Sequence, residues 1–184
     1  KRKFMIEENS KGNYEFSSVQ FNYPIDFAKD VMQWGRKNVD TEDIFVDPHD
    51  ESYGLEDNIH TTVLYGIHDK TPSKTKRIIE PTPPFKITLG EIDKFPGGTD
   101  YDVIKINVEG DVLRDLHYKI RENITNTNSY PDYKPHMTIG YVLPNSCNHL
   151  LGSEEFKGMT FQVNTVIFSS SEKKWKKFKI KLEG

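Results

Sequence analysis

The chain has 184 residues and a formal net charge of −3, and these values narrow what the protein can be. The length suffices for one domain with a sizeable hydrophobic core, and we expect residues 1–184 to form a single unit. The charge argues against sequence-blind binding to long DNA or RNA, which needs a basic surface, but not against binding a small nucleotide. With one cysteine, Cys147, neither an internal disulfide nor a multi-cysteine zinc site can form, so a reducing compartment is expected.

The printed sequence shows no pattern typical of a targeting signal. There is no apolar run approaching twenty residues and no signal-peptide pattern, which predicts a soluble, cytosolic protein without membrane partners. The chain starts at Lys1 rather than at a methionine, so trimming at the N-terminus is left open.

The first half of the chain begins with a strand pattern followed by a helix pattern. Residues 19–23 alternate like a strand, and Pro24 and Asp26 then open a helix that we expect to end near Gly35. The acidic stretch 41–58 is either a solvated connection or a loop that lines a site.

The middle of the chain predicts a short helix and a hairpin. The helix follows Pro72 and Ser73 and ends near Glu80, because the prolines after it prevent its continuation. Residues 85–91 and 102–108 alternate as two strands around a turn-like Pro-Gly-Gly segment, which is typical of a hairpin.

The second half repeats this order. A helix is expected from Asp111, a polar loop over 123–134, and two further strands over 160–168 and 174–182. Together with the first half, this order predicts an α+β fold of two similar lobes whose sheets face a common central groove.

Two segments repeat one pattern: His60-Thr61-Thr62-Val63-Leu64-Tyr65 and His136-Met137-Thr138-Ile139-Gly140-Tyr141 both read His-x-Thr, a β-branched residue, any residue, Tyr. Each opens a short apolar run bounded by turn residues, which favours a buried strand. In a strand the His and the Thr two positions later point the same way, roughly 7 Å apart at the backbone. Two such strands side by side would offer two imidazoles and two hydroxyls to one cleft. Simple alternation places both tyrosines on the opposite face, in the core.

This set of groups suits the cleavage of a ribonucleotide phosphodiester bond. One imidazole can remove the proton of a ribose 2′-hydroxyl while the other protonates the departing 5′-oxygen. Hydroxyls can donate to the phosphate oxygens on which charge develops. We therefore predict that His60, Thr62, His136 and Thr138 are catalytic and that no metal ion or cofactor is required. The alternative is that both histidines only cap strands in the core.

The doubled motif resembles the two-histidine (2H) phosphoesterase superfamily, which includes the LigT-type 2′-5′ RNA ligases and the cyclic phosphodiesterases. Residues 53–68, with Tyr14-Glu15-Phe16 and Tyr101-Asp102-Val103, more narrowly resemble the phage anti-CBASS nucleases, which destroy the cyclic di- and trinucleotide messengers of a bacterial immune system. One departure is Thr61, where the superfamily commonly has an apolar residue. The resemblance implies substrate contacts by Tyr14 and Phe95, and also by Phe16, for which core packing is the alternative. Glu172 follows three serines after a predicted strand and is a further candidate substrate contact, with a solvated charge as the alternative.

Three functions remain open at this stage. The favoured one is a metal-independent nuclease that cleaves cyclic di- and trinucleotides in the host cytosol and so counteracts CBASS immunity. The second is a 2′,3′-cyclic phosphodiesterase or 2′-5′ RNA ligase acting on RNA ends, which we would expect to carry a basic track. The third is a sponge that only sequesters cyclic nucleotides. Three of the four remaining histidines, His68, His117 and His149, are expected on the surface or in packing roles, and His49 lies in the acidic stretch, where a solvated role is expected.

Overall fold

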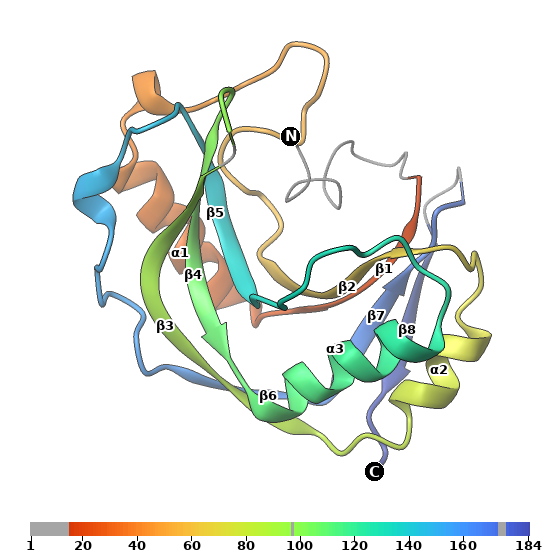
Figure 1. Cartoon of the computed structure of the whole chain (residues 1–184). Coiled ribbons are helices and arrows are strands. Elements are labelled where there is room, and N and C mark those ends of the chain that lie inside the picture. The colour runs from red at the N-terminus through yellow and green to blue at the C-terminus, as the bar shows by residue number, and fades with distance from the viewer. Residues whose placement is uncertain (1–14, 97, 173–175) are drawn as a thin grey trace.

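Two antiparallel sheets of four strands each form the framework of the chain in a computed structural model, which describes residues 15–96, 98–172 and 176–184 (Figure 1). The strands are β1 (Ser17–Asn22), β2 (His60–Ile67), β3 (Phe85–Pro96), β4 (Asp102–Glu109), β5 (His136–Val142), β6 (Thr160–Val163), β7 (Thr165–Ser169) and β8 (Lys177–Lys181). The helices are α1 (Ile25–Asn38), α2 (Ser73–Ile79) and α3 (Asp111–Asn123), with short 3₁₀ turns η2 (Thr41–Asp43) and η3 (Asn148–Leu150). The expected α+β class is confirmed.

A strand–helix–strand unit occurs twice and defines the two lobes. The first copy is β1, α1 and β2, and the second is β4, α3 and β5; in each copy the two strands pair antiparallel. The full strand orders are β2-β1-β7-β8 and β5-β4-β3-β6, so the first lobe is completed by strands from the end of the chain. Each helix packs against the His-x-Thr strand of the other lobe, α3 on β2 and α1 on β5.

The end of the chain differs from the expected pair of long strands. The stretch 160–168 is two strands, β6 and β7, which are interrupted at Asn164 and belong to different sheets. β6 pairs with β3, whereas β7 pairs with β1. The apolar residues of both segments are compatible with either sheet, so alternation alone could not show that the chain crosses between them.

Helix α1 runs three residues past Gly35, where it was expected to end. Gly35 is buried on the face that also carries Phe27 and Val31. A β-carbon at this position would lie 3.0 Å from the Ile139 Cγ2 atom of β5, so the glycine permits close packing of helix on strand. Its function here is close approach rather than helix termination.

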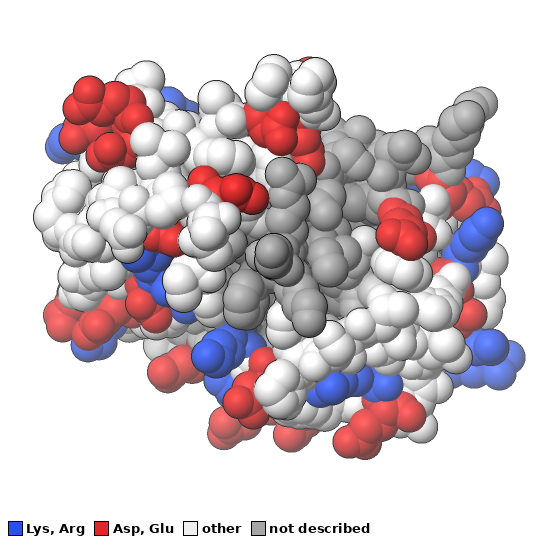
Figure 2. Space-filling model, turned by 45° about the horizontal axis from the view of Figure 1, so that its top comes forward, with Lys and Arg blue, Asp and Glu red and all other residues white. Residues whose placement is uncertain are grey.

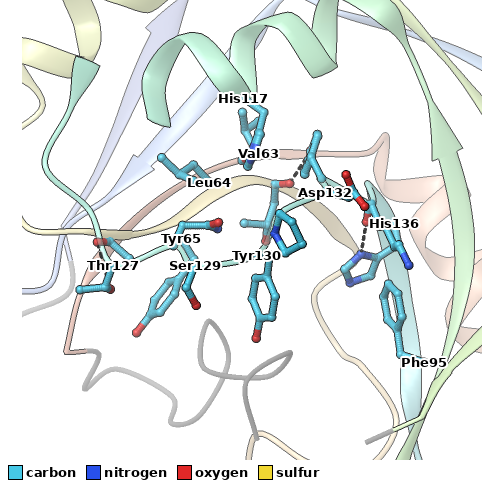
Figure 3. A pocket seen from close by; sticks show the side chains of 16 residues that line it. Val63, Leu64, Tyr65, Phe95, His117, Thr127, Ser129, Tyr130, Asp132 and His136 are labelled. Atoms are coloured by element: carbon cyan, nitrogen blue, oxygen red, sulfur yellow. Dashed lines mark hydrogen bonds between the residues drawn. The ribbon is translucent and has the colours of Figure 1, made fainter. Parts of the chain in front are cut away.

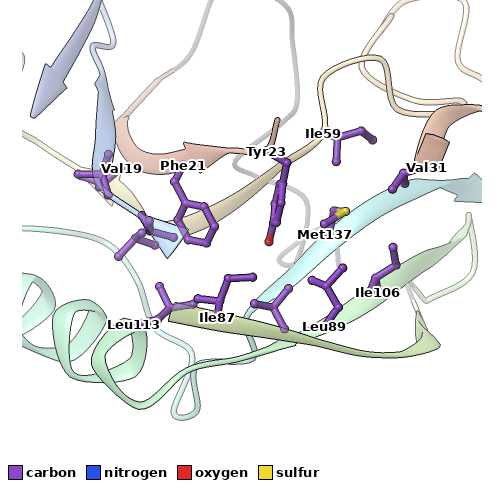
Figure 4. Packing of buried hydrophobic residues seen from close by; sticks show 14 of the residues in the cluster. Val19, Phe21, Tyr23, Val31, Ile59, Ile87, Leu89, Ile106, Leu113 and Met137 are labelled. Atoms are coloured by element: carbon purple, nitrogen blue, oxygen red, sulfur yellow. The ribbon is translucent and has the colours of Figure 1, made fainter. Parts of the chain in front are cut away.

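One hydrophobic core fills the space between the two lobes (Figure 4). Val19 and Phe21 of β1 lie opposite Ile87 and Leu89 of β3, and all four are at most 1% exposed. Because alternate residues of a strand face opposite ways, the residues between them on the central strands point to the other face of each sheet. No helix among the described residues is long and apolar enough to span a membrane.

Candidate functional site

The two His-x-Thr strands are edge strands that meet between the sheets. β2 is the edge strand of one sheet and β5 is the edge strand of the other. The two strands lie side by side, with Cα atoms within 8 Å of each other, as Figure 1 also shows. His60, Thr62 and His136 are each partly exposed at this junction, whereas Thr138 is buried at 5% exposure. The fold therefore brings the two motifs together, as the sequence pattern predicted.

Both histidines are oriented in the same way. The Nδ1 atom of His60 lies 2.7 Å from the carbonyl oxygen of Asn58, and the Nδ1 atom of His136 lies 2.9 Å from that of Lys134. A carbonyl can only accept, so Nδ1 carries a hydrogen in both rings. Nε2 is consequently the nitrogen of each ring that is left to accept or donate a proton. An acid-base pair requires such a nitrogen in both histidines.

An irregularity follows each motif at the same position. In β2 the pairing with β1 steps from Thr62 to Leu64 and leaves Val63 without a partner residue. In β5 the pairing with β4 steps from Thr138 to Gly140 and leaves Ile139 without one. Each β-branched residue of the repeated pattern is thus a bulge, and a bulge turns the following side chains to the other face.

The bulges overturn the expectation for the repeated tyrosines. Tyr65 was expected in the core, but it is partly exposed and lines a cavity on the side of His60. Tyr141 is buried as expected, yet it lies on the His136 side of its sheet, where Tyr53 and Tyr101 pack against it. Strict alternation placed both tyrosines on the wrong face of their strands, because the extra residue of a bulge reverses the alternation that follows it.

Side chains from the second lobe hold the outer edge of β2. The Tyr133 hydroxyl donates to the carbonyl of Thr62 at 2.7 Å, and His117 Nδ1 donates to the carbonyl of bulged Val63 at 2.6 Å. The two rings stack with centroids 4.0 Å apart and planes 3° apart. Burial lowers the pKa of His117 to about 4, although the hydrogen bond to Val63 favours the protonated ring. His117 is therefore neutral near pH 7.

Backbone groups from the first lobe hold the outer edge of β5. The N–H of Glu56 donates to the carbonyl of bulged Ile139 at 2.8 Å, and the N–H of Tyr141 donates to the carbonyl of Gly54 at 2.9 Å. A β-carbon at Gly140 would lie 2.7 Å from a methyl group of Leu55 and 3.2 Å from the backbone of Gly54 and Leu55, so the glycine favours this close approach. The acidic stretch 41–58, which was open between two roles, therefore braces the site.

A cavity of about 370 Å³ extends from His136 and Thr62 along β2, and its lining includes neither His60 nor Thr138. Figure 3 shows His136 and Phe95 at one end of it and Tyr65, Thr127 and Ser129 at the other. The loop between α3 and β5 forms the outer wall and contributes Tyr130. This volume falls in the lower part of the range for small-molecule sites.

Three of the predicted substrate contacts have different positions. Phe95 lines the cavity and packs edge-on against His136, with ring centroids 4.8 Å apart. Glu172 is not among the cavity-lining residues; its carboxylate lies 3.4 Å from the Lys176 ammonium. Tyr14 lies outside the described residues. Binding by all three residues stays a prediction.

Sequence reasoning missed three residues around the site. His117 was expected on the surface or in packing; it is buried in packing, and it also donates a hydrogen bond to the β2 bulge, which was not expected. Its signal was present, since it shares the buried face of α3 with Leu113, Leu116 and Ile120 at helical spacing. Lys105 lies beside the site because it pairs with Thr138 across β4 and β5. Tyr133 is in an irregular loop and Lys105 in an alternating strand, so neither carried a local signal.

Within residues 15–96, 98–172 and 176–184, no three His, Cys, Asp or Glu side chains gather as a metal site requires.

Several solved structures share this fold. A protein from Thermus thermophilus, TT0787, has a TM-score of 0.62 at 15% identity over 92% of this chain and 98% of its own. E. coli LigT complexed with 3′-AMP has a TM-score of 0.57 at 16% identity over 90% and 95%. Kluyveromyces marxianus Usb1 with uridine monophosphate has a TM-score of 0.52 at 9% identity over 91% and 97%.

Sequence comparison gives the family. No curated protein sequence matches the chain. A family model described as the 2′-5′ RNA ligase superfamily matches residues 45–174, which include both His-x-Thr strands and most of the chain. The chain therefore belongs to the 2′-5′ RNA ligase superfamily of 2H phosphoesterases.

Proposed function

We propose that the protein is a metal-independent phosphodiesterase that cleaves the 3′-5′ bonds of cyclic di- and trinucleotide messengers and thereby counteracts CBASS immunity. The observation that carries the proposal is the matched pair of histidines on facing edge strands, each with Nδ1 bonded to a carbonyl two residues earlier. Binding alone calls for no such pair, whereas acid-base catalysis does.

The proposed reaction balances with these groups. One histidine accepts the proton of the ribose 2′-hydroxyl at Nε2, and the 2′-oxygen forms a bond to phosphorus. The bond from phosphorus to the 5′-oxygen breaks, and the second histidine, already protonated, gives its proton to that oxygen. The hydroxyls of Thr62 and Thr138 donate to the non-bridging phosphate oxygens as their charge grows. The products are a 2′,3′-cyclic phosphate and a free 5′-hydroxyl.

The size and charge of the site favour a small nucleotide over a long strand. A cavity of about 370 Å³ is typical of small-molecule sites. On the face in Figure 2, acidic and basic side chains of the described residues are interspersed rather than gathered in a basic track. Aromatic side chains such as Tyr65 and Phe95 in the cavity could pack against a base. The finer assignment to cyclic messengers also uses the resemblance of residues 53–68 to anti-CBASS nucleases.

Action on RNA ends is the second candidate. The LigT structure holds 3′-AMP and the Usb1 structure holds uridine monophosphate, so mononucleotides bind to other proteins with this fold. The same histidine pair could open a 2′,3′-cyclic phosphate with water as the nucleophile. The substrate, rather than the catalytic groups, separates the two candidates.

A substrate panel tests the proposal. The protein would be incubated with cyclic di- and trinucleotides, linear RNA and 2′,3′-cyclic nucleotides in excess EDTA, and the products separated by chromatography. We expect ring opening of a cyclic oligonucleotide to a linear product that ends in a 2′,3′-cyclic phosphate. Turnover of RNA ends alone would favour the second candidate. Tight binding of cyclic nucleotides without cleavage would identify a sponge and contradict the proposal.

A further inference from the structure

The two lobes place matching polar residues beside their catalytic motifs. On β1, Asn22 pairs with His60 and Gln20 pairs with Thr62. On β4, Asn107 pairs with His136 and Lys105 pairs with Thr138. Directly paired residues share a face of the sheet, so each lobe sets an Asn beside its His and a longer polar side chain beside its Thr.

The hydrogen bonds inside these pairs match as well. Gln20 Nε2 donates to Asn22 Oδ1 at 3.3 Å in the first lobe. Lys105 Nζ donates to Asn107 Oδ1 in the second lobe. The two positions differ mainly in charge, because a neutral amide in one lobe corresponds to an ammonium group in the other.

This ammonium group is buried and held on three sides. The Lys105 side chain is 5% exposed, and its Nζ lies 3.4 Å from Asp93 Oδ2 and 4.1 Å above the centroid of the Phe95 ring. Phe95 in turn packs edge-on against His136. The ammonium group is thus positioned on the histidine side of the sheet by contacts that restrict its movement.

The charge is not needed to fill this position. Gln20 shows that a neutral side chain can make the bond to the neighbouring Asn, and burying an ammonium group is costly. Burial lowers the pKa of Lys105, which Asp93 opposes. The Asp93 side chain is 50% exposed, so solvent screens its charge far more than that of Lys105. A buried cation with a solvent-screened partner leaves a positive potential on this side of the cleft.

We infer that Lys105 is a charge-stabilising residue of the site, whose ammonium group favours the extra negative charge that develops on a phosphodiester beside Thr138 during attack. The inference rests on the proposed function. It makes the two lobes unequal in the reaction: the second lobe carries a cation for the phosphate oxygens, whereas the neutral Gln20 stands at the equivalent place in the first lobe. A preorganised charge of this kind acts mainly on the transition state.

The test compares Lys105→Gln with a matched control. Lys105→Gln reproduces the residue of the other lobe and removes only the charge. The control is Lys94→Gln, because Lys94 is also in an ion pair, 3.1 Å from the buried Asp102, and its side chain is only 13% exposed. Lys94 pairs with Ile104, the neighbour of Lys105 on β4, and therefore lies on the opposite face of the sheet. We expect Lys105→Gln to lower kcat by about 10² to 10³, the usual loss for one preorganised donor, with a smaller change in KM. Lys94→Gln should keep kcat.

Two further measurements separate charge from structure. A nucleoside–vanadate complex, in which vanadium is five-coordinate like phosphorus in the transition state, should inhibit the wild type more strongly than Lys105→Gln. Lys105→Arg should recover part of kcat. If Lys105→Gln does not fold, Lys105→Met replaces it as the uncharged variant. Retention of kcat by a folded uncharged variant, or an equal loss in Lys94→Gln, would overturn the role of Lys105 alone. A wild type that cleaves no phosphodiester would instead overturn the proposed function.

Discussion

The strands β2 and β5 carry the same motif but are braced in different ways. The outer carbonyls of β2 at Thr62 and Val63 accept hydrogen bonds from side chains, those of Tyr133 and His117. The outer carbonyl of β5 at Ile139 accepts from a backbone N–H. In both strands the bracing segment comes from the other lobe, so each half of the site is completed by its partner.

This difference distinguishes the catalytic candidates, which are the same in the two strands, from the residues that hold the strands in place, which are not. A backbone brace depends on chain geometry and is indifferent to most substitutions, whereas a brace of a phenol and an imidazole depends on individual residues and on pH. The two motifs are therefore expected to respond equally to changes in their own His and Thr, but unequally to changes in their surroundings. The predictions below test that contrast.

The largest effect is expected from the histidines, where the two strands should be equivalent. His60→Ala and His136→Ala should each lower turnover by about 10² to 10⁴, because each removes a positioned acid or base. Steady-state kinetics on folded protein, checked by circular dichroism, measures this. The equivalence fails if either folded variant turns over near the wild-type rate.

The threonines should give the next largest effect. Valine keeps the branched shape and removes only the hydroxyl, so Thr62→Val and Thr138→Val should lower kcat by about 10- to 100-fold, the value of a hydrogen bond to a charged group. Binding of a non-cleavable analogue should change less than kcat. Normal cleavage by both variants would assign the two threonines to structure.

The first asymmetric prediction concerns stability against pH at His117. The pKa of His117 is about 4 in the fold against 6.5 for the free side chain, so below pH 6.5 the unfolded chain binds a proton that the folded chain does not. The contribution of neutral His117 to the free energy of unfolding is fully present above pH 6.5. It is lost progressively as the pH falls from 6.5 toward 4, by up to about 3 kcal/mol.

Denaturant titrations at several pH values measure this loss. His117→Gln keeps a donor for the Val63 carbonyl but does not titrate, so the free energy of unfolding should depend less on pH in this variant. Identical pH dependence in the wild type and in His117→Gln would show that His117 is not the titrating group.

The smallest effect is expected from the Tyr133 hydroxyl. Tyr133→Phe removes one hydrogen bond to Thr62 and should cost about 1 kcal/mol, seen as a several-fold fall in kcat. Tyr23→Phe is the matched control, since its hydroxyl lies 2.8 Å from Thr61 Oγ1 on the opposite face of the same strand. The control should lower the melting temperature with little change in kcat. Equal kcat losses in the two variants would mean that the brace acts only through stability.

The sequence predicted most elements and the pairing of the two motifs, because periodicity and turn residues are local signals. It did not predict features that depend on contacts between distant segments. Gly35 read as a helix end until its contact with Ile139 was known. The bulges at Val63 and Ile139 have no sequence signature, so the faces predicted for Tyr65 and Tyr141 were wrong.

The site followed the same division. The four motif residues could be proposed from the sequence because one strand carries each His together with its Thr, and their catalytic role stays a prediction. Lys105, His117 and Tyr133 act across strands, helix and loop, and their neighbours become visible only in the fold. The identity of the substrate is even harder to predict from the sequence, because its recognition depends on the shape of the whole cavity.

The most direct test of the central claim is to compare a cyclic dinucleotide with its 2′-deoxy counterpart in excess EDTA. If two histidines drive attack by the substrate's own 2′-hydroxyl, the ribose compound is opened to a 2′,3′-cyclic phosphate and the deoxy compound, which has no internal nucleophile, is not cleaved. Rapid cleavage of the deoxy compound would show that water attacks phosphorus directly. Loss of ribose cleavage in EDTA would show that a metal ion takes part, and either result would contradict the account.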